Sequence, residues 1–351
     1  MRPPATRPKP LLPPRGGSGS ARAQPGAALL AAMITVALIA TLAAAALWQQ
    51  WRGVEIEAAE RARAQADWIL TGALDWGRLI LAGDARNSST DHLGEPWAVP
   101  LAEARLSTFL AAGESGGNAA DADADAAPDL DAFLSGQVTD LQSRLNLMNL
   151  ALGSAQDQLL AITIFTRLFE LLNLPASELG ALQRGLLAAR QAMAGDSAAA
   201  GGGNSDGNAA ILPQRFEQLT WLGLSRETLA TLAPHATLLP DAGITPLNLN
   251  TASAEAIYAA LPGIDLAKAR QLVSLRQQAH FRSAADALGR IGAASSANAW
   301  VGVRSNYFEI QGRLRLDNLT LQEVAVVRRG RTSSGQTVTP LWRVRTPLTA
   351  P

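Results

Sequence analysis

The sequence predicts an α+β protein in which a long N-terminal helix packs on an antiparallel sheet, with a large all-α domain inserted between strands of that sheet. Residues 27–48 are apolar and uncharged, and no proline interrupts the helix-forming sequence that continues to about Gly83. Residues 155–300 are rich in alanine and leucine, whereas alternating apolar and polar residues return after Ser305. The chain therefore divides into a basic leader (1–26), a membrane half-helix (27–48), a first body segment (49–154), a helical insertion (155–300) and C-terminal strands (301–351).

Composition excludes several classes of function. The chain has 30 basic and 30 acidic residues, so no net charge points to nucleic acid as a partner. It has no cysteine, which rules out disulfides, thiolate metal sites and cysteine nucleophiles. Its three histidines lie far apart in the sequence, and their spacing is not that of the motif residues of a metalloprotease or of a catalytic triad. We therefore predict a protein that is not an enzyme and has no catalytic residues.

The N-terminus predicts a single membrane span. The 22 residues from Ala27 to Trp48 are uncharged and long enough to cross roughly 30 Å of hydrocarbon as a helix. They also exceed the core of a cleaved secretory signal, which is about 7–15 residues long. Five basic residues precede the span and no acidic residue occurs before Glu55, which keeps the N-terminus in the cytoplasm. A buried helix of a soluble protein is the alternative interpretation, and the basic, proline-rich leader argues against it.

Beyond the membrane the same helix is amphipathic. Ile69, Ala73, Trp76 and Ile80 follow one another at intervals of four, three and four residues. This stripe needs a partner surface, and we expect it to face the sheet.

The leader and the helix together resemble a type IV prepilin or pseudopilin. The resemblance implies that a prepilin peptidase cuts between Gly26 and Ala27 and that the new terminus is N-methylated. Two departures are Ala27, where most pilins have phenylalanine or methionine, and Pro25 before the cut. Ala31 replaces the glutamate that most pilins carry as the fifth mature residue. A carboxylate inside the bilayer is costly unless it is paired, so an apolar residue suits a subunit with nothing above it.

Two further segments narrow the resemblance to the K-type minor pseudopilins of type II secretion systems. Residues 91–98 (DHLGEPWA) and 138–150 (VTDLQSRLNLMNL) are similar to segments of that family, which also lacks the glutamate at the place of Ala31. We expect Asn146 and Asn149 in the second segment to close turns. The resemblance implies a pilin-like fold whose sheet is interrupted by an α-domain.

The same resemblance implies a role and a location. The subunit would cap the tip of a periplasmic pseudopilus and support export of folded proteins across the outer membrane. It would be a single-pass protein of the inner membrane with its body in the periplasm. Its partners would be the minor pseudopilins of the I, J and H types, the prepilin peptidase, the inner-membrane assembly platform and secreted substrates. Some members bind Ca²⁺, and Asp140 and Asp317 are the candidate ligands here; no other cofactor is expected.

Low-complexity sequence interrupts the body twice, at residues 113–129 and 194–210. We interpret the first as an acidic, solvated loop and the second as a linker between helices. The spacing of Asp121, Asp123 and Asp125 is that of an EF-hand start, but the required glycine and distal glutamate are not in register.

Periodicity and turn residues predict the elements of the body. Helices are expected at Ala155–Leu172, Ala176–Ala194, Phe216–Leu222, Ser225–Leu232, Ala254–Leu261, Ala267–Gln278 and Ala284–Leu288. Strands are expected at Gln137–Leu141, Tyr307–Asp317, Thr320–Arg329 and Thr337–Arg345.

Residues 247–288 also resemble the helix-hairpin-helix repeat of competence-type DNA-binding proteins. Leu261, Pro262, Gly263 and Ile264 would form the hairpin, with Asn250, Thr251 and Ser253 as helix caps and Phe281 as an apolar anchor. A membrane-anchored DNA-binding protein is therefore the alternative function. Asp265 argues against it because its carboxylate would repel a phosphate at the hairpin, and no basic tract surrounds Lys268, Arg270 and Arg276. We expect the hairpin to be structural.

Overall fold

The computed structural model describes residues 25–108, 132–198, 211–240, 243–293, 300–316, 319–333 and 335–348. The chain divides into two compact units, Met1–Arg61 and Ala62–Pro351. Helix α1 (Pro25–Asn87) contributes to both. Proline suits the start of a helix because the first backbone N–H has no intrahelical acceptor.

The first unit contains the apolar part of α1. Its most apolar 18-residue window has a mean hydropathy of 2.4, and none of that window is buried. Within the described ranges α1 is the one helix that is long and apolar enough to cross a membrane.

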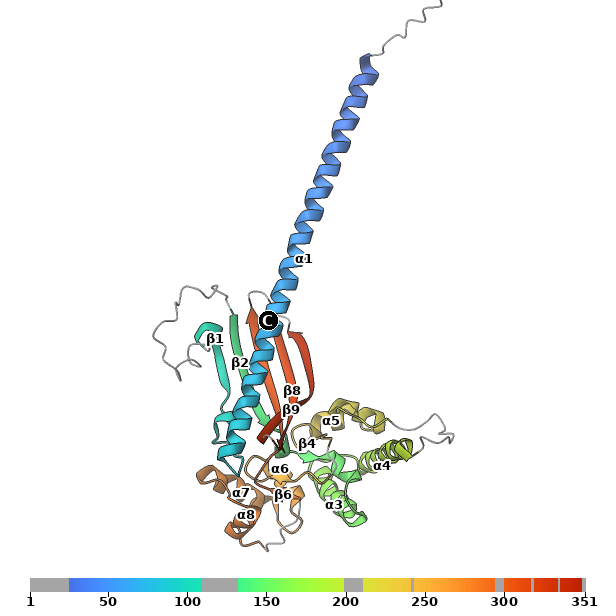
Figure 1. The fold of residues 1–351 in the computed structure, drawn as a ribbon. Helices are drawn as coiled ribbons and strands as arrows, with labels where there is room; N and C mark the ends of the chain where they lie inside the picture. The colour runs from blue at the N-terminus through green and yellow to red at the C-terminus, as the bar shows by residue number, and fades with distance from the viewer. Residues whose placement is uncertain are drawn as a thin grey trace, which may run out of the picture. The chain divides into compact units, whose positions relative to one another are not determined.

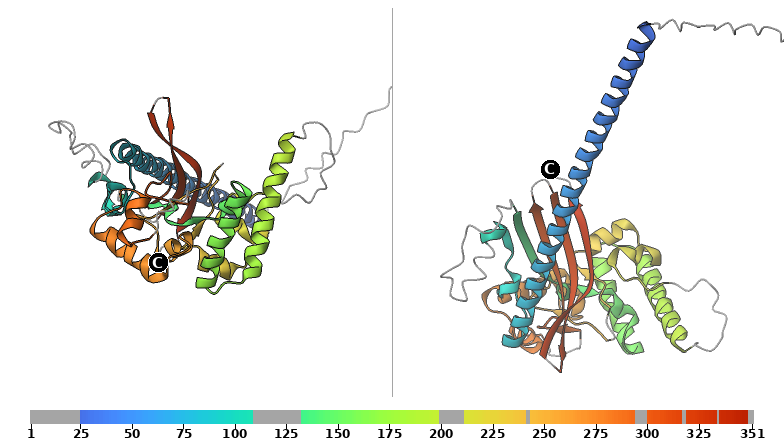
Figure 2. Two further views of the ribbon diagram at one scale, coloured as in Figure 1. Left: turned by 90° about the horizontal axis from the view of Figure 1, so that it is seen from below. Right: turned by 45° about the horizontal axis from the view of Figure 1, so that its top comes forward.

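In the second unit, the rest of α1 lies along one face of a five-stranded sheet (Figures 1 and 2). Its buried face consists of residues spaced four or three apart: Ala66, Leu70, Leu74, Gly77, Leu81 and Ala85. The predicted stripe is therefore wrong by one residue, since Ile69, Ala73 and Ile80 are half-buried and Trp76 is exposed. Gly77 belongs to the buried face. A Cβ at that position would lie 3.2 Å from Ile310, so the helix lies close to the sheet at this glycine.

The sheet is antiparallel throughout, in the order β1-β2-β7-β8-β9. Its strands are β1 (Leu101–Arg105), β2 (Ala132–Asp140), β7 (Tyr307–Leu316), β8 (Leu319–Thr332) and β9 (Gly335–Leu348). Strand β2 pairs with β7 from Ala132↔Leu316 to Asp140↔Phe308, so the whole helical region is inserted between two neighbouring strands. Three of the four predicted strands extend by a few residues, and the sequence missed β1, which is short and has an irregular register with β2.

The inserted region gathers at one end of the sheet (Figure 1). Its helices are α3 (Ala155–Leu171), α4 (Ala176–Ala198), α5 (Arg226–Leu232), α6 (Ala254–Ala260), α7 (Leu266–Gln278) and α8 (Ala284–Arg290). It also contains the 3-10 helices η2 (Leu141–Ser143), η3 (Leu147–Ala151) and η4 (Phe216–Leu222), whereas η1 (Pro96–Ala98) lies between α1 and β1. Two small parallel pairs, β3 (Leu145–Asn146) with β4 (Ala236–Thr237) and β5 (Leu247–Asn248) with β6 (Val301–Gly302), complete it.

Local capping explains why these helices begin where they do. Helices α3, α5, α6, α7 and α8 each follow a serine or aspartate whose side chain accepts a hydrogen bond from the third amide of the helix. The caps are Ser154, Ser225, Ser253, Asp265 and Ser283. The predicted helix bounds agree within two residues, except that α4 continues to Ala198 and Phe216–Leu222 is a 3-10 helix.

The elements of the insertion pack around one apolar core. It includes Leu147, Phe165, Leu182, Ile257 and Phe281, all fully or almost fully buried. The same core begins at Leu145 and ends at Val301. Residues 145–154 therefore pack with the helices rather than with the sheet, although the proposed division places them in the preceding segment.

Candidate functional site

The sequence assigns processing to the start of α1. Gly26 and Ala27 lie in the first turn of this helix, and Ala31 follows one turn later with an exposed side chain. Cleavage after Gly26 and the tip-specific role of Ala31 stay predictions.

A buried polar cluster joins the sheet to the insertion. We call it the polar junction and define it as Asp91, Asp140, Asn248, Thr251, Ser305 and Arg329. All six side chains belong to buried residues, and they come from the loop after α1, the end of β2, the segment around β5, the entry to β7, and β8.

Asp140 is the centre of one half of the polar junction. Its Oδ2 accepts hydrogen bonds from Thr251 Oγ1 at 2.5 Å, from Ser305 Oγ at 2.7 Å and from Asn248 Nδ2 at 3.0 Å. Its Oδ1 accepts from the backbone N–H of Gln142 at 2.7 Å, which caps η2. Burial raises the pKa of Asp140 to about 6, against the hydrogen bonds from Thr251, Ser305 and Gln142, which lower it.

Arg329 is the centre of the other half. Its Nη1 donates to Asp84 Oδ2 at 2.9 Å, and its Nη2 donates to Asp91 Oδ2 at 2.5 Å. Nη2 also donates to the backbone carbonyl of Ser305 at 2.6 Å. Asp91 in turn accepts from the backbone N–H of Ser305 at 2.7 Å, while its own carbonyl accepts from Asn248 Nδ2 at 3.1 Å. The polar junction thus connects the sheet and the insertion through buried, charge-assisted hydrogen bonds, and Arg329 joins it to Asp84 of α1.

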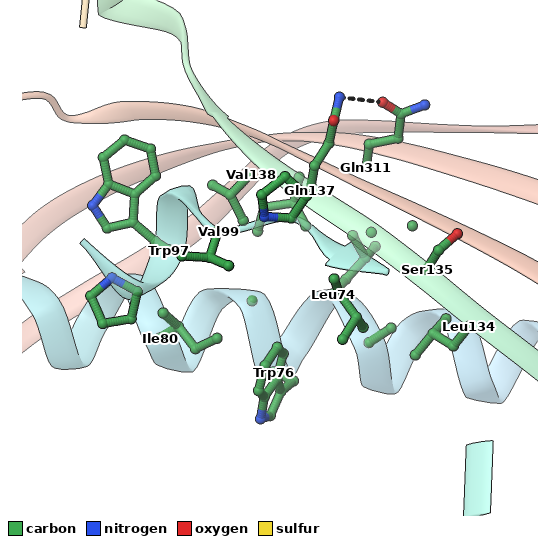
Figure 3. Close-up of a pocket in the computed structure, with 18 residues that line it drawn as sticks. Leu74, Trp76, Ile80, Trp97, Val99, Leu134, Ser135, Gln137, Val138 and Gln311 are labelled. Atoms are coloured by element: carbon green, nitrogen blue, oxygen red, sulfur yellow. Dashed lines mark hydrogen bonds between the residues drawn. The ribbon is translucent and has the colours of Figure 1, made fainter. Parts of the chain in front are cut away.

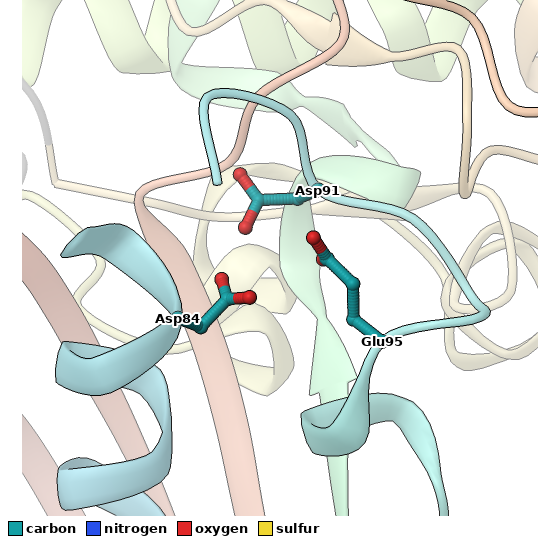
Figure 4. A group of neighbouring side chains, drawn as sticks. All are labelled: Asp84, Asp91 and Glu95. Atoms are coloured by element: carbon teal, nitrogen blue, oxygen red, sulfur yellow. The ribbon is translucent and has the colours of Figure 1, made fainter. Parts of the chain in front are cut away.

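Three carboxylates meet beside Arg329. Oxygens of Asp84, Asp91 and Glu95 lie within 4.8 Å of one another (Figure 4). Burial is the main cause that raises the pKa of Asp84 to about 6, and repulsion by Glu95 and Asp91 raises it further. The neighbouring Arg329 acts in the opposite direction and lowers this pKa. Such oxygens are ligands that Ca²⁺ prefers.

The carboxylates do not fit a calcium site in this arrangement, because Arg329 already supplies the positive charge. Its guanidinium bonds Asp84 and Asp91, and Glu95 Oε2 accepts from Trp97 Nε1 at 2.7 Å and from the backbone N–H of His92 at 3.0 Å. Donors therefore already engage one oxygen of Asp84, both oxygens of Asp91 and one oxygen of Glu95.

The sequence-based metal candidates were different residues. Among the described residues, the donors from which Asp140 accepts hydrogen bonds are neutral, and Asp140 does not belong to the group of three carboxylates. Asp317 lies outside the described residues, as do residues 113–129, where the EF-hand spacing occurs. The sequence missed the group because Asp84 is on α1 and only Asp91 and Glu95 belong to the segment that resembles the K-type family.

The two asparagines of the second family segment do more than close turns. Asn146 caps η3 by accepting from Met148 N at 3.1 Å, as expected. Asn149 instead bonds the backbone of Thr245, donating to its carbonyl and accepting from its N–H, both at 3.0 Å. These side chains fix η3 to a segment almost 100 residues away in the sequence.

The hairpin residues Leu261, Pro262, Gly263 and Ile264 connect α6 to α7, and Gly263 has a φ of +105°. Asp265 caps α7 by accepting from Lys268 N at 2.8 Å, so a carboxylate occupies the helix N-terminus. Arg276 donates through Nη1 to the carbonyls of Leu249 and Ala252, which bonds it to the segment before α6. Of the three predicted caps only Ser253 caps a helix, since Asn250 bonds the backbone of Phe281 and Thr251 bonds Asp140. These contacts of the hairpin therefore do not support DNA binding as the alternative function.

An apolar groove of about 250 Å³ runs beside α1 (Figure 3). Leu74, Trp76 and Ile80 of α1 form one wall, and Leu134 and Val138 of β2 contribute to the other. Val99, which is 66% exposed, and Trp76, which is 44% exposed, lie at this groove. Three of the four residues of the stripe predicted to face the sheet, Ala73, Trp76 and Ile80, therefore line the groove instead. Large apolar side chains exposed together are typical of a protein–protein contact.

The architecture defines the class of protein. A long helix whose first part is apolar and whose second part covers an antiparallel sheet, with a helical insertion between two sheet strands, is a pilin-like α+β fold. The chain matches a chain in a solved structure described as the GspK-GspI-GspJ complex from the enterotoxigenic Escherichia coli type 2 secretion system. The TM-score is 0.58 at 16% identity, over 82% of this chain and 98% of that chain. No curated protein matches.

Two family models identify the family. Residues 143–241 and residues 247–306 each match a model described as type II secretion system (T2SS), protein K. The chain belongs to this family, the K-type minor pseudopilins.

Proposed function

We propose that the chain caps the tip of the periplasmic pseudopilus and thereby supports export of folded proteins across the outer membrane. The observation that carries this proposal is the large helical insertion that the polar junction holds at one end of the sheet. A pilin-like subunit with so much extra mass at that end would prevent another subunit from stacking above it. Its work is packing and recognition rather than catalysis.

The partners would be other minor pseudopilins. The similar solved structure contains a complex of GspK with GspI and GspJ, which supports the I and J types as neighbours of this chain. The H type, the inner-membrane assembly platform and secreted substrates follow from the family resemblance alone. We assign the apolar groove beside α1 to contact with one of the partner pseudopilins.

The groove is tested by adding a charge to its rim. Val99→Lys should weaken association with the partner pseudopilins, because burying an unpaired ammonium is costly. Ile211→Lys is the matched control, since Ile211 is 74% exposed and does not line the groove. Equal association by both variants in a pull-down of the full chain would remove the groove from the interface.

Before assembly, the prepilin peptidase would cut between Gly26 and Ala27 on the cytoplasmic face, and Ala27 would be N-methylated. The body would then lie in the periplasm, anchored by the apolar part of α1. Intact-mass measurement of the chain purified from membranes should give an N-methylated Ala27. An intact Met1 or a cut elsewhere would contradict this proposal.

The tip position itself is tested at Ala31. In cells that lack the native copy, Ala31→Leu should restore secretion, whereas Ala31→Glu should reduce it. The carboxylate would have no subunit above to pair with and would cost several kcal/mol in the bilayer, about 3 on insertion scales. Full secretion with Ala31→Glu, at equal protein level, would contradict the tip assignment.

A further inference from the structure

The apolar groove beside α1 has a floor that lacks side chains. Gly136 of β2 and Gly312 of β7 line the groove and pair with each other across the two strands. Side chains two positions apart in a strand point to the same face of the sheet. The residues two positions before and after each glycine are all large and apolar: Leu134, Val138, Ile310 and Leu314. Two apolar side chains that this alternation would place against α1 are therefore missing.

The glycine pair lies between two parts of the core that joins α1 to the sheet. On one side Leu74 belongs to a buried cluster with Ile310, and on the other Leu70 belongs to a buried cluster with Leu314. The groove thus occupies the place where neither cluster fills the space beneath the helix, because the paired glycines contribute only backbone.

The two flanks of α1 differ in charge. On the side of β9, Arg78 donates through Nε to the carbonyl of Val338 at 2.8 Å, and Asp67 forms an ion pair with Arg345. On the side of β2, none of the 18 residues that line the groove is charged (Figure 3). Burying an unpaired charge is costly, so a charged side chain or a lipid headgroup does not suit this lining. The lining instead suits an apolar, uncharged occupant.

We propose that the groove binds an aromatic side chain of a partner pseudopilin. This inference rests on the proposed assembly and adds the chemistry of the group that anchors it. An apolar cavity of about 150 Å³ holds a benzene molecule, so a groove of about 250 Å³ has room for a larger ring. Residues that anchor interfaces are enriched in tryptophan, tyrosine and arginine, and the uncharged lining argues against arginine. The side-chain amides of Gln137 and Gln311 line the same groove and can accept from an indole N–H or a phenol O–H.

Filling the groove from within tests the proposal. The full chain in dodecyl maltoside is titrated with the I- and J-type subunits of its own secretion system. Ala73→Leu adds three carbon atoms to a residue that lines the groove, whereas Ala64→Leu makes the same change at an exposed position of α1 outside it. Gly312→Ala fills part of the floor, since its Cβ would lie 3.6 Å from Leu70, an ordinary van der Waals contact. Gly330→Ala is the matched control in β8, outside the groove.

Ala73→Leu should weaken association about tenfold or more and Gly312→Ala by a smaller factor, while both controls stay within about twofold of the unmodified chain. Equal association by Ala73→Leu and Ala64→Leu, with the unmodified chain still bound, would overturn the anchor site and leave the proposed assembly standing. No association by the unmodified chain would contradict the assembly and this site with it. Thermal unfolding confirms that each variant is folded.

A photo-crosslinker identifies the occupant. Val99, which is 66% exposed at the groove, is replaced by p-benzoylphenylalanine, and the assembled complex is irradiated. Mass spectrometry of the crosslinked peptide should identify a partner segment that contains tryptophan, tyrosine or phenylalanine, and replacing that residue by alanine should weaken association as Ala73→Leu does. A crosslink only to lipid, to detergent or to a second copy of this chain would overturn the proposal.

Discussion

Replacing Arg329 by methionine should destabilise the body severely. The change keeps most of the side-chain volume but removes the guanidinium that bonds Asp84, Asp91 and the carbonyl of Ser305. The side chains of Asp84 and Asp91 are 8% and 1% exposed, so water cannot replace the lost donors. Breaking a buried ion pair by removing one partner costs about 3–5 kcal/mol. Because domains are stable by about 5–15 kcal/mol, this is a large fraction of the total.

Urea unfolding followed by tryptophan fluorescence measures the loss. Arg315→Met is the matched control, since Arg315 pairs with Glu103 at 2.9 Å but the two side chains are 45% and 52% exposed. An exposed pair contributes about 0–1 kcal/mol. The loss in Arg329→Met should also shrink at acidic pH, because protonation neutralises the carboxylates that have lost their partner. A loss below about 1 kcal/mol, or one equal to that of the control, would refute the role assigned to Arg329.

Three other predictions concern the effect of single substitutions on stability. Burial raises the folded-state pKa of Asp140 from 3.8 to about 6, so the folded chain binds more protons than the unfolded chain between these values, and the stability from this group falls as pH rises through that window. Asp140→Asn should remove this component from a plot of unfolding free energy against pH, and an unchanged difference between pH 4 and 6 would contradict it. Gly263→Ala should cost about 1 kcal/mol at a φ of +105°, whereas Gly289→Ala, in a helix with open space around it, should be neutral or stabilising by up to about 1 kcal/mol. Gly72→Ala should stabilise α1 by up to about 1 kcal/mol, whereas Gly77→Ala should gain less because its new methyl group meets Ile310 at 3.2 Å; thermal unfolding compares the two, and an equal gain would contradict close packing at Gly77.

The sequence predicted the elements well because their signals are local. Serine or aspartate caps, alternation in the strands and turn residues lie within a few positions of the ends they determine. The family resemblance also indicated a sheet interrupted by the helical insertion, but it did not indicate that β2 pairs with β7.

Contacts between distant segments were not predictable in the same way. Two apolar stripes on α1 are offset by one residue, and the one that faces the sheet contains Gly77, where a Cβ would lie 3.2 Å from Ile310. Arg329 of the polar junction bonds Asp84 and Asp91, which lie 245 and 238 residues earlier in the chain. No periodicity relates residues so far apart. The sequence analysis therefore did not find the group of Asp84, Asp91 and Glu95, and it named Asp140 and Asp317 as candidate metal ligands instead.

Assembly with other minor pseudopilins through the pilin-like body can be measured by native mass spectrometry. The full chain is co-expressed with the I- and J-type subunits of its own secretion system and released from detergent. We expect a complex that contains all three chains. An I–J pair that forms without this chain, with this chain remaining alone in the same sample, would contradict it.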